Sequence, residues 1–386
     1  MNNIMLWVTL GCDALIVFAF AVTPFVTRKT ELFGVSLPSS EIGRIELKEM
    51  RGAYLRAVLT SGAVLIALNI LSFLAFSHEM VQVRLYLILI FAYCAAAFII
   101  YLVFHKRMAA FKATQSWRAY GAAANASWGS GTGAREPVLV SDSAPAGREV
   151  VHPAWLWLYA VIGGGTLLYL WYVWPSLPDS IPMNMDMAGA VAEYVDKGPR
   201  AFFMMMLAQW IIIGVFIMVY YMIPAAKRQI DADNPVGSRE QGRRFRYLMS
   251  ACMVFGGAAL ALMVGILPIA MARSDGGMGF VIVPLVLTTA IVVVMLVVMF
   301  RAGQGGSKLK VDAEEPPAEH KRMADTDDDR YWKLGVFYIN PKDPAWLVEK
   351  RFGIGWTMNL GRPAGWLIFG SVIAAIIIVL VIGYSS

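Results

Sequence analysis

The residues of this sequence that could do chemistry are few, and the least expected is Asp13, an acidic residue inside an apolar run. A carboxyl group in hydrocarbon is costly and usually faces a partner or a cavity. Asn69, Thr166, Gln209 and Thr288 lie in other apolar runs. At about 1.5 Å per helical residue, all of them fall ~10–14 Å from the predicted outer surface. The sequence therefore predicts one polar layer, which is either a ligand pocket or a set of interhelical hydrogen bonds.

A second set of polar and thioether side chains lies in residues 174–200, between two apolar runs. The prolines of this stretch exclude a continuing helix and favour extended or turn geometry. In an extended strand Met183, Met185 and Met187 share one side, and thioether sulfur is a ligand for Cu(I). Because neither His nor Cys accompanies them, we expect apolar contacts at the bilayer interface and no metal site.

A third set lies in residues 325–362, where aromatics, prolines and charges crowd together before the last apolar run. The segment Asn340-Pro-Lys-Asp-Pro predicts a rigid turn. The candidate docking residues for a cytoplasmic protein partner are Tyr331, Trp332, Tyr338, Asn340, Pro341, Asp343, Pro344, Lys350, Arg351 and Trp356. The alternative is a lipid anchor, because aromatic rings suit the headgroup region and basic side chains attract anionic lipid. Either way, we expect a folded juxtamembrane module.

The elements that position these residues are membrane-spanning helices. The chain has 386 residues, of which 58% are hydrophobic and only 16% are charged, whereas soluble domains average about 25% charged residues. Eight apolar runs reach the ~20 residues that a span needs: Ile4–Val26, Tyr54–Phe76, Val81–Phe104, Ala154–Trp174, Phe202–Ile223, Tyr247–Met271, Phe280–Phe300 and Ala364–Ile382. The predicted fold is all-α, a polytopic helical membrane protein with about eight transmembrane helices.

The orientation follows from the basic residues. The loops after the first, third, fifth and seventh runs, with the adjoining helix ends, hold 29 of the 33 Lys and Arg residues. Cytoplasmic loops carry such an excess, so this bias also accounts for the net charge of +6 without invoking nucleic acid. Both termini are predicted to be extracytoplasmic, as is the loop 174–200, and the module 325–362 is predicted to face the cytoplasm.

The resulting organisation has six parts. They are three N-terminal helices (1–104) with a cytoplasmic loop at 28–52, a flexible cytoplasmic loop (105–152), four helices (153–300) with the outside loop 174–200, a cytoplasmic linker (301–324), the juxtamembrane module (325–362) and a final helix (363–386). The sequence holds no catalytic signature such as His-Glu-x-x-His, a nucleophile elbow or a phosphate-binding loop. We therefore expect no enzyme activity and no cofactor.

Two stretches resemble known families. "LPDSIPMNMDMAGAVAEYVDKG" is similar to the Leu-Pro-x-x-Ile-Pro-x-His-aromatic-Asn-x-x-Gly-x-x-Asp-x-x-x-x-Lys motif of an uncharacterised bacterial membrane domain, which is also found in immunity proteins against the sporulation-delaying-protein toxin. The matching residues are Leu177, Pro178, Ile181, Pro182, Gly189 and Lys197, while Asn184 replaces the family histidine, Met185 its aromatic residue, Asp186 its asparagine and Ala192 its aspartate. "DDDRYWKLGVFYINPKDPAWLVEKRFGIGWTMNLGRPAGW" closely resembles a short C-terminal domain, also uncharacterised, that accompanies that family. "RKTELFGVSLP" is similar to the first cytoplasmic loop of Gram-positive members.

The resemblance implies a sensor or immunity-type signalling protein of the bacterial plasma membrane. It would meet an extracytoplasmic peptide ligand and a cytoplasmic protein partner, in contact with membrane lipid. The candidate ligand-binding residues are Asp13, Asn69, Gln209, Pro182, Asn184, Asp186, Gly189 and Lys197. The rival prediction is a small-solute or metal-ion transporter that uses the polar layer; transporters often have two halves of matching hydropathy, a pattern this sequence lacks.

Overall fold

The computed structural model describes residues 2–28, 30–37, 41, 43–115, 148–185, 191–227, 235–273, 279–311, 329–363, 365–366 and 370. The chain divides into two compact units. Unit 1 comprises residues 1–5, 147–224 and 243–301, and unit 2 comprises residues 6–146, 225–242 and 302–386.

Within the described ranges, seven helical segments are long and apolar enough to cross a membrane. The helices are α1 (Asn2–Val26), α2 (Ile45–Ala75), α3 (Glu79–Thr114), α5 (Trp157–Val173), α6 (Pro199–Ala225), α7 (Pro235–Ala251), α8 (Gly257–Arg273) and α9 (Gly279–Ala302), and α7 and α8 form one continuous segment. The predicted all-α membrane fold is confirmed. The eighth predicted run, Ala364–Ile382, lies almost wholly outside the described residues.

Three helices extend well past the apolar runs that predicted them, because charged turns continue the helix beyond the apolar run. α2 begins at Ile45 rather than Tyr54, α3 continues to Thr114, and α7 begins at Pro235 rather than Tyr247. Residues 105–114 are therefore helical, and the flexible loop predicted from residue 105 is wrong for them. The predicted linker is wrong in the same way at its start, because residues 304–306 form a 3₁₀ turn, η5 (Gln304–Gly306), with all three residues buried.

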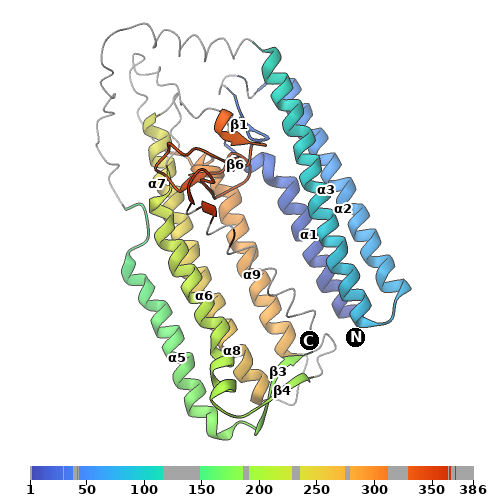
Figure 1. Ribbon diagram of the computed structural model, residues 1–386, viewed down its shortest axis with the longest axis vertical. Helices are drawn as coiled ribbons and strands as arrows, with labels where there is room; N and C mark the ends of the chain where they lie inside the picture. Colours follow the sequence, from blue (N-terminus) through green and yellow to red (C-terminus); the bar gives the residue numbers. More distant parts are fainter. Residues whose placement is uncertain are drawn as a thin grey trace. The chain divides into compact units, whose positions relative to one another are not determined.

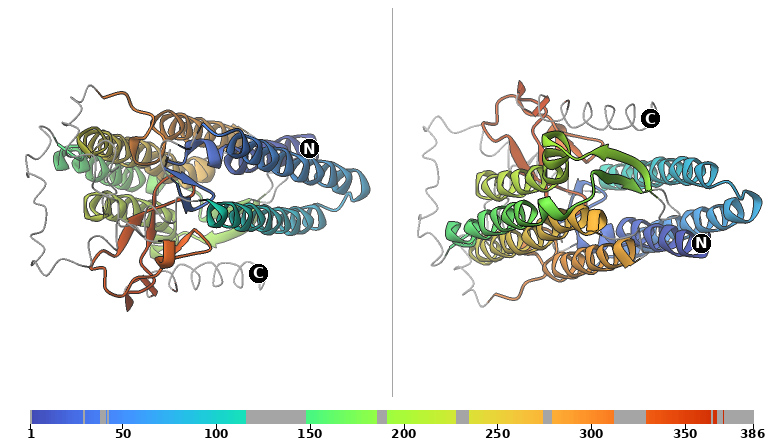
Figure 2. Two further views of the ribbon diagram at one scale, coloured as in Figure 1. Left: turned by 90° about the horizontal axis from the view of Figure 1, so that it is seen from above. Right: turned by 90° about the horizontal axis from the view of Figure 1, so that it is seen from below.

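Unit 2 is built on α1, α2 and α3, which lie side by side (Figures 1 and 2). Two short elements outside the spans belong to the same unit and pack against these helices. The first is the hairpin of β1 (Glu31–Leu32) and β2 (Val35–Ser36). The second is the juxtamembrane module, which contains η7 (Asp329–Tyr331), β5 (Trp332–Lys333), β6 (Phe337–Tyr338), β7 (Leu347–Glu349) and β8 (Trp356–Met358).

Unit 1 packs α5, α6 and α8 around small side chains. η2 (Pro153–Leu156) precedes α5 and η3 (Trp174–Ser176) follows it. Between α7 and α8 the helix widens to a π-helical turn, η4 (Cys252–Gly256). There the Tyr159 hydroxyl donates to the Met253 carbonyl at 2.6 Å. Gly257 follows the turn, and a Cβ there would lie 2.3 Å from the Tyr159 hydroxyl, so only glycine allows this contact.

The loop of unit 1 that is predicted to be extracytoplasmic is a hairpin of β3 (Ser180–Met185) and β4 (Val191–Asp196), called the outer hairpin below. Its prolines predicted extended geometry, and that prediction is confirmed for the described part of the loop. Ile181 is fully buried against α5, α6 and α8, so the hairpin is seated on the helices. Two register shifts, one on each side of Asn184, interrupt the strict alternation that would align the methionines. Met187 lies outside the described residues.

Candidate functional site

The juxtamembrane module is a small folded element made of two antiparallel hairpins. β5 pairs with β6 and β7 pairs with β8, and Tyr338 bridges to Asn359 beside β8. Trp332, Tyr338 and Val348 form its buried core. The predicted folded module is thus present, with a core of its own.

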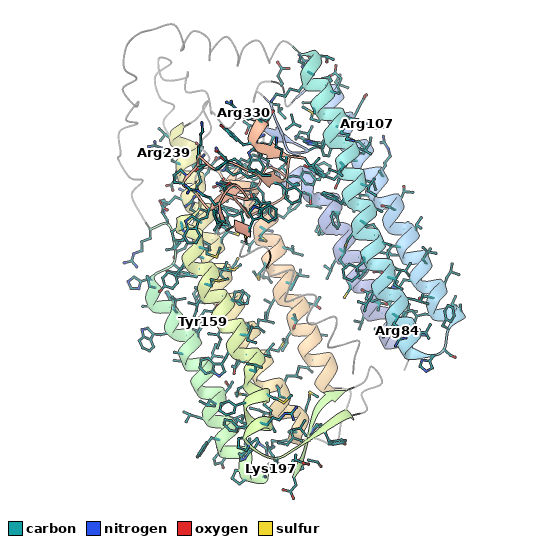
Figure 3. All side chains as sticks on the ribbon, viewed as in Figure 1. Arg84, Arg107, Tyr159, Lys197, Arg239 and Arg330 are labelled. Carbon is teal, nitrogen blue, oxygen red and sulfur yellow. The ribbon has the colours of Figure 1, made fainter. Side chains whose placement is uncertain are left out.

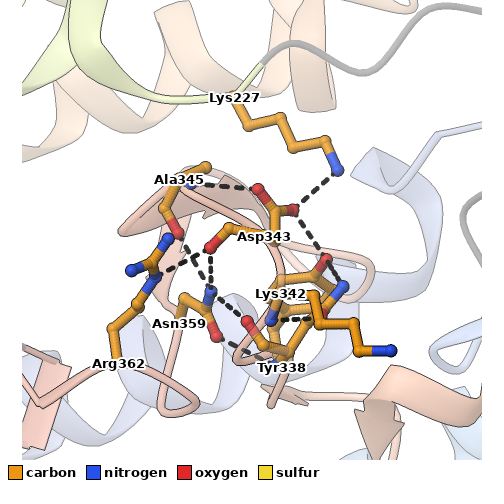
Figure 4. A network of polar contacts seen from close by, with 8 residues as sticks. Lys227, Tyr338, Lys342, Asp343, Ala345, Asn359 and Arg362 are labelled. Carbon is orange, nitrogen blue, oxygen red and sulfur yellow. Dashed lines mark hydrogen bonds and ion pairs between the residues drawn. The ribbon is translucent and has the colours of Figure 1, made fainter.

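A buried asparagine holds the proline-rich turn of the module (Figure 4). Asn359 is fully buried. Its Nδ2 group donates to the carbonyl oxygens of Asn340 (2.9 Å), Ala345 (3.0 Å) and Asp343 (3.3 Å). Its Oδ1 atom accepts from the backbone N–H groups of Asn340 and Gly361, both at 3.0 Å. One side chain therefore fixes both ends of the turn, so the predicted rigidity has a physical cause beyond its prolines.

Asp343 ties the same turn to a segment outside the module. Its carboxylate accepts from the Ala345 N–H (2.9 Å), the Tyr338 hydroxyl (2.8 Å) and the Lys227 ammonium (2.8 Å). Burial opposes the ionised form, but these donors together outweigh it and hold the pKa of Asp343 below its usual range. The Lys227 N–H also donates to the Leu347 carbonyl at 2.8 Å, so this segment adds to the edge of β7.

The module contacts the β1–β2 hairpin turn to turn. Phe33–Gly34 and Leu334–Gly335 both have positive φ angles (49°, 76°, 54° and 71°), which places two type I′ hairpin turns in unit 2. A Cβ on Gly34 would lie 2.5 Å from the carbonyl oxygen and 2.6 Å from the Cα of Gly335. The two turns are therefore in backbone contact, which glycine alone permits.

Two side chains of α3 bind both turns. The Tyr101 hydroxyl lies 2.8 Å from the Leu334 carbonyl and 3.4 Å from the Phe33 carbonyl. Nδ1 of His105 lies 2.8 Å from the Phe33 carbonyl. Through the two contacts of 2.8 Å, α3 makes one hydrogen bond to each hairpin: Tyr101 binds the β5–β6 turn and His105 binds the β1–β2 turn.

An aromatic side chain of the module inserts beside these turns. The Phe352 ring centroid lies 4.4 Å from that of Tyr101, 6.1 Å from Phe33 and 6.2 Å from Tyr54. Those three residues belong to the buried core that α2, α3 and the β1–β2 hairpin share. Phe352 therefore extends the core of the helices into the module.

Ion pairs surround the aromatic insertion. Asp329 accepts from Ser36 Oγ at 2.9 Å and Lys112 Nζ at 2.5 Å, and it pairs with Arg351. Burial disfavours its charge, but Arg351 and Lys112 more than offset this and keep the pKa of Asp329 below its usual range. At a separate point, Arg28 pairs with Glu349.

The stretch predicted as a linker completes the attachment. Gln304 Nε2 donates to the Gly355 carbonyl at 2.9 Å, and Gln304 Oε1 accepts from the Gly355 N–H at 2.7 Å. We call the full set of contacts from the module to the β1–β2 hairpin, α3, Arg28, Lys227 and Gln304 the juxtamembrane joint.

The predicted docking residues separate into three groups by burial. Trp332, Tyr338, Asp343 and Arg351 are buried, whereas Pro341 and Pro344 are exposed and Tyr331, Asn340, Lys350 and Trp356 are partly buried. Arg351 lies over the Trp332 ring at 5.1 Å while it pairs with Asp329. Burial lowers the pKa of Lys350. Many of these side chains thus contact other residues of the same chain in this conformation.

The predicted ligand residues of the outer hairpin are only partly described. Pro182 is buried in β3 and Asn184 lies in the same strand, while Asp186 and Gly189 fall outside the described residues. Lys197, labelled in Figure 3, donates to the Leu177 carbonyl at 2.7 Å and the Pro175 carbonyl at 3.2 Å. It therefore closes the base of the hairpin.

The predicted polar layer resolves into pairs within each unit. In unit 2, Asn69 Nδ2 donates to Asp13 Oδ2 at 2.7 Å. In unit 1, the Thr166 hydroxyl donates to Gln209 Oε1 at 2.8 Å. Thr288 Oγ1 lies 3.1 Å from Met263 Sδ. Hydrogen bonds between helices, one of the two predicted alternatives, are therefore present, and among the described residues no group of His, Cys, Asp and Glu is arranged to hold a metal.

Sequence reasoning missed the residues that hold the module from outside it, which are Tyr101, His105, Lys112 and Gln304, and it did not assign Phe352 of the module to this contact. The available signal was the repeated pattern of a large apolar residue followed by Gly-Val, at Phe33-Gly34-Val35 and Leu334-Gly335-Val336. Gly at the second central position of a turn favours type I′ geometry, but nothing local shows that two such turns meet.

Two family models match the chain. A domain of unknown function (DUF1648) matches residues 161–209, which include most of α5, the β3–β4 hairpin and the start of α6. A family of unknown function (DUF5808) matches residues 341–366, in the second half of the module. No curated protein and no solved structure matches the chain. The two stretches predicted to resemble uncharacterised domains thus coincide with domains of unknown function, and the chain is a membrane-spanning helical protein that contains both.

Proposed function

We propose that the protein is a non-enzymatic sensor or immunity-type protein of the bacterial plasma membrane. A membrane-active peptide outside the cell contacts the β3–β4 hairpin of unit 1. The juxtamembrane module then changes its attachment to unit 2 and so becomes available to a cytoplasmic protein partner.

One observation carries the proposal, namely that the juxtamembrane joint consists of individually reversible contacts. It combines ion pairs, hydrogen bonds and one inserted ring, with glycine turns in backbone contact. Each such contact contributes about 1 kcal/mol net, so the attached and released states differ by an amount that a ligand can supply. A joint of this kind is suited to switch between an attached and a released state of the module.

The surface that release would uncover also supports a protein partner. It carries the Phe352 ring together with the charged groups of Arg351 and Glu349. An aromatic side chain and an arginine at the centre of a patch are typical of binding hot spots. The exposed Trp346 and Pro344 nearby extend this face. Membrane lipid is the competing ligand for the same groups.

The input side of the proposal rests on the outer hairpin. Tyr194 on β4 has 59% of its surface exposed, on a hairpin that Ile181 and Lys197 fix to the helices. A rigid scaffold that presents an exposed aromatic ring is suited to bind an apolar peptide. The chain itself links this hairpin to the joint, because α6 follows the hairpin and continues into Lys227.

The test uses a toxin-sensitive bacterial strain that expresses the full chain and is challenged with the sporulation-delaying-protein toxin. We expect survival above that of cells with an empty vector. Tyr194→Ala should lose this protection, whereas Trp157→Ala, which removes a ring 70% exposed at the start of α5, should keep it. Equal survival of wild-type and vector cells, at confirmed membrane abundance, would refute the immunity role.

The relay is tested separately by the reactivity of a cysteine at Val336, which packs against the buried core at the joint. The native cysteines Cys12, Cys94 and Cys252 are replaced by alanine. Addition of the toxin to membranes should change the rate at which a maleimide labels Val336→Cys. An unchanged rate in cells that are protected would mean that protection does not pass through the joint.

The rival transporter reading has one observation in its favour, because a buried acid–amide pair lies on α1 and α2. Solute or ion flux into vesicles that contain the purified chain, with loss of that flux in Asp13→Leu, would favour this reading. The sensor proposal expects no such flux.

A further inference from the structure

The pair of Asp13 and Asn69 is incomplete as a hydrogen-bonding unit. Both side chains are fully buried, at 0% exposure. Their one mutual hydrogen bond runs from Asn69 Nδ2 to Asp13 Oδ2 at 2.7 Å. Oδ1 of Asp13 and Oδ1 of Asn69 have no hydrogen-bond partner in the described part of the chain. Two buried acceptors are thus left on two groups that already face each other.

The surroundings supply no charge to balance an ionised carboxylate. Within the described residues, no Lys, Arg or His forms an ion pair with Asp13. The titratable groups near Asp13 are Tyr86 on α3 and Cys12 on its own helix. Tyr86 interacts with both Cys12 and Asp13. An ionised carboxylate here would be a buried, unpaired charge in a span of apolar residues, which is strongly unfavourable.

We propose that Asp13 and Asn69 form a proton-binding site, in which Oδ1 of Asp13 carries the proton and donates it to Oδ1 of Asn69. The proton makes Oδ1 of Asp13 a hydrogen-bond donor, and Oδ1 of Asn69 accepts from it, so that both buried oxygens gain a partner. The carboxylic acid and the carboxamide then pair through two hydrogen bonds between α1 and α2. Asn69 acts as the positioning residue, since its amide group fixes which oxygen of Asp13 is protonated.

A metal cation is a poorer occupant of the same place. Small hard cations take six or more oxygen ligands, and this pair offers two free oxygens. Thr9 lies one helical turn before Asp13, and its hydroxyl already donates to the Leu6 carbonyl at 2.9 Å. The proton is the one cation that two oxygens can satisfy. This inference stands independently of the proposed sensor function.

The test is infrared spectroscopy of the full chain in lipid vesicles, with Asp13→Asn as reference. We expect the wild type to show at neutral pH the carbonyl stretch of a protonated carboxylic acid, shifted in deuterated water and absent from Asp13→Asn. The band should disappear only at alkaline pH, and replacement of sodium by choline should leave it unchanged. A band that appears only on acidification, or one that sodium removes, would overturn the proposal.

A second measurement covers the case in which a variant folds poorly. Asn reproduces the shape and hydrogen bonds of the neutral acid, so Asp13→Asn should unfold at the same temperature as the wild type at neutral pH. If Asp13 were ionised, the same change would remove a buried charge and raise the unfolding temperature. Asn69→Leu removes the partner oxygen and should shift the carbonyl band to the position of a free acid; an unmoved band would exclude Asn69 as the acceptor.

Discussion

Backbone contact between the two hairpin turns predicts that Gly34→Ala will open the juxtamembrane joint. The matched control is Gly355→Ala, in the same module. Both glycines have positive φ angles (76° and 105°), but a Cβ on Gly355 meets no atom within 4 Å, whereas one on Gly34 lies 2.5 Å from the Gly335 carbonyl oxygen. The pair of variants therefore separates the conformational cost of alanine from the loss of the contact itself.

The magnitudes follow from these geometries. Alanine in the left-handed region costs about 1–2 kcal/mol at either position. At Gly34 the overlapping atoms are backbone, so relief requires the hairpins to separate. Separation removes the Tyr101 hydrogen bond to Leu334 (2.8 Å) and the Ser36 hydrogen bond to Asp329 (2.9 Å), each worth about 1 kcal/mol. Gly34→Ala should thus destabilise the joint by about 2 kcal/mol more than the control, a roughly 30-fold difference in the open population.

The assay is the labelling rate of Val336→Cys, in the background without native cysteines and in lipid vesicles. When opening is fast relative to labelling, this rate is proportional to the open population. We expect Gly34→Ala to label roughly 30-fold faster than Gly355→Ala, with equal membrane abundance. Equal labelling of the two variants would refute the reasoning, because it would show that the turns do not hold the joint closed.

Two further predictions concern the joint. Asp329 has a lowered pKa in the folded state, so its stabilising effect is present above the ordinary carboxyl pKa of about 3.9 and is lost as pH falls through the lower folded value. Labelling of Val336→Cys, relative to the same thiol in the unfolded chain at the same pH, should therefore rise only in strong acid. Asp329→Asn should reduce this rise, and the rest of it comes from Asp343, whose pKa is also lowered. Phe352→Ala should destabilise the joint by about 2–4 kcal/mol and Phe352→Leu by less, measured as the denaturant midpoint of the accessible thiol; equal midpoints for both variants and the wild type would contradict the role of the ring.

The length of the apolar runs made the helices predictable. An apolar run of sufficient length requires a helix in hydrocarbon, whatever its neighbours are, and seven of the eight predicted runs have a helix in the described residues. The ends were missed because the charged turns beyond the bilayer, such as Ile45–Ala53, carry no apolar signal. Prolines likewise predicted extended or turn geometry for the loop 174–200 and a turn at Asn340–Pro344, since their backbone limits are local.

Contacts between distant segments were not predictable in this way. The turn at Asn340–Pro344 is held by Asn359, and the side of α3 that binds the module is marked only by Tyr101 and His105 within an apolar run. The polar layer illustrates the same limit. The depth of a side chain in the membrane follows from its position along a helix, but its hydrogen-bond partner on another helix does not. Counting placed Asp13, Asn69, Thr166 and Gln209 at one level, and the fold pairs them within each unit.

The two turns of the joint also predict opposite responses to the same substitution. Type I′ turns prefer Asn at their first position, where Phe33 and Leu334 have φ angles of 49° and 54°. Phe33 is fully buried among aromatic rings, whereas the Leu334 side chain is 43% exposed, so only the former offsets its strain by packing. Leu334→Asn keeps the carbonyl that binds Tyr101 and should stabilise the module by about 0.5–1 kcal/mol, while Phe33→Asn should destabilise unit 2 by about 3 kcal/mol or more. Thermal unfolding of the two variants measures both effects. If Leu334→Asn proved as damaging as Phe33→Asn, the leucine side chain would have a binding role that its exposure does not reveal.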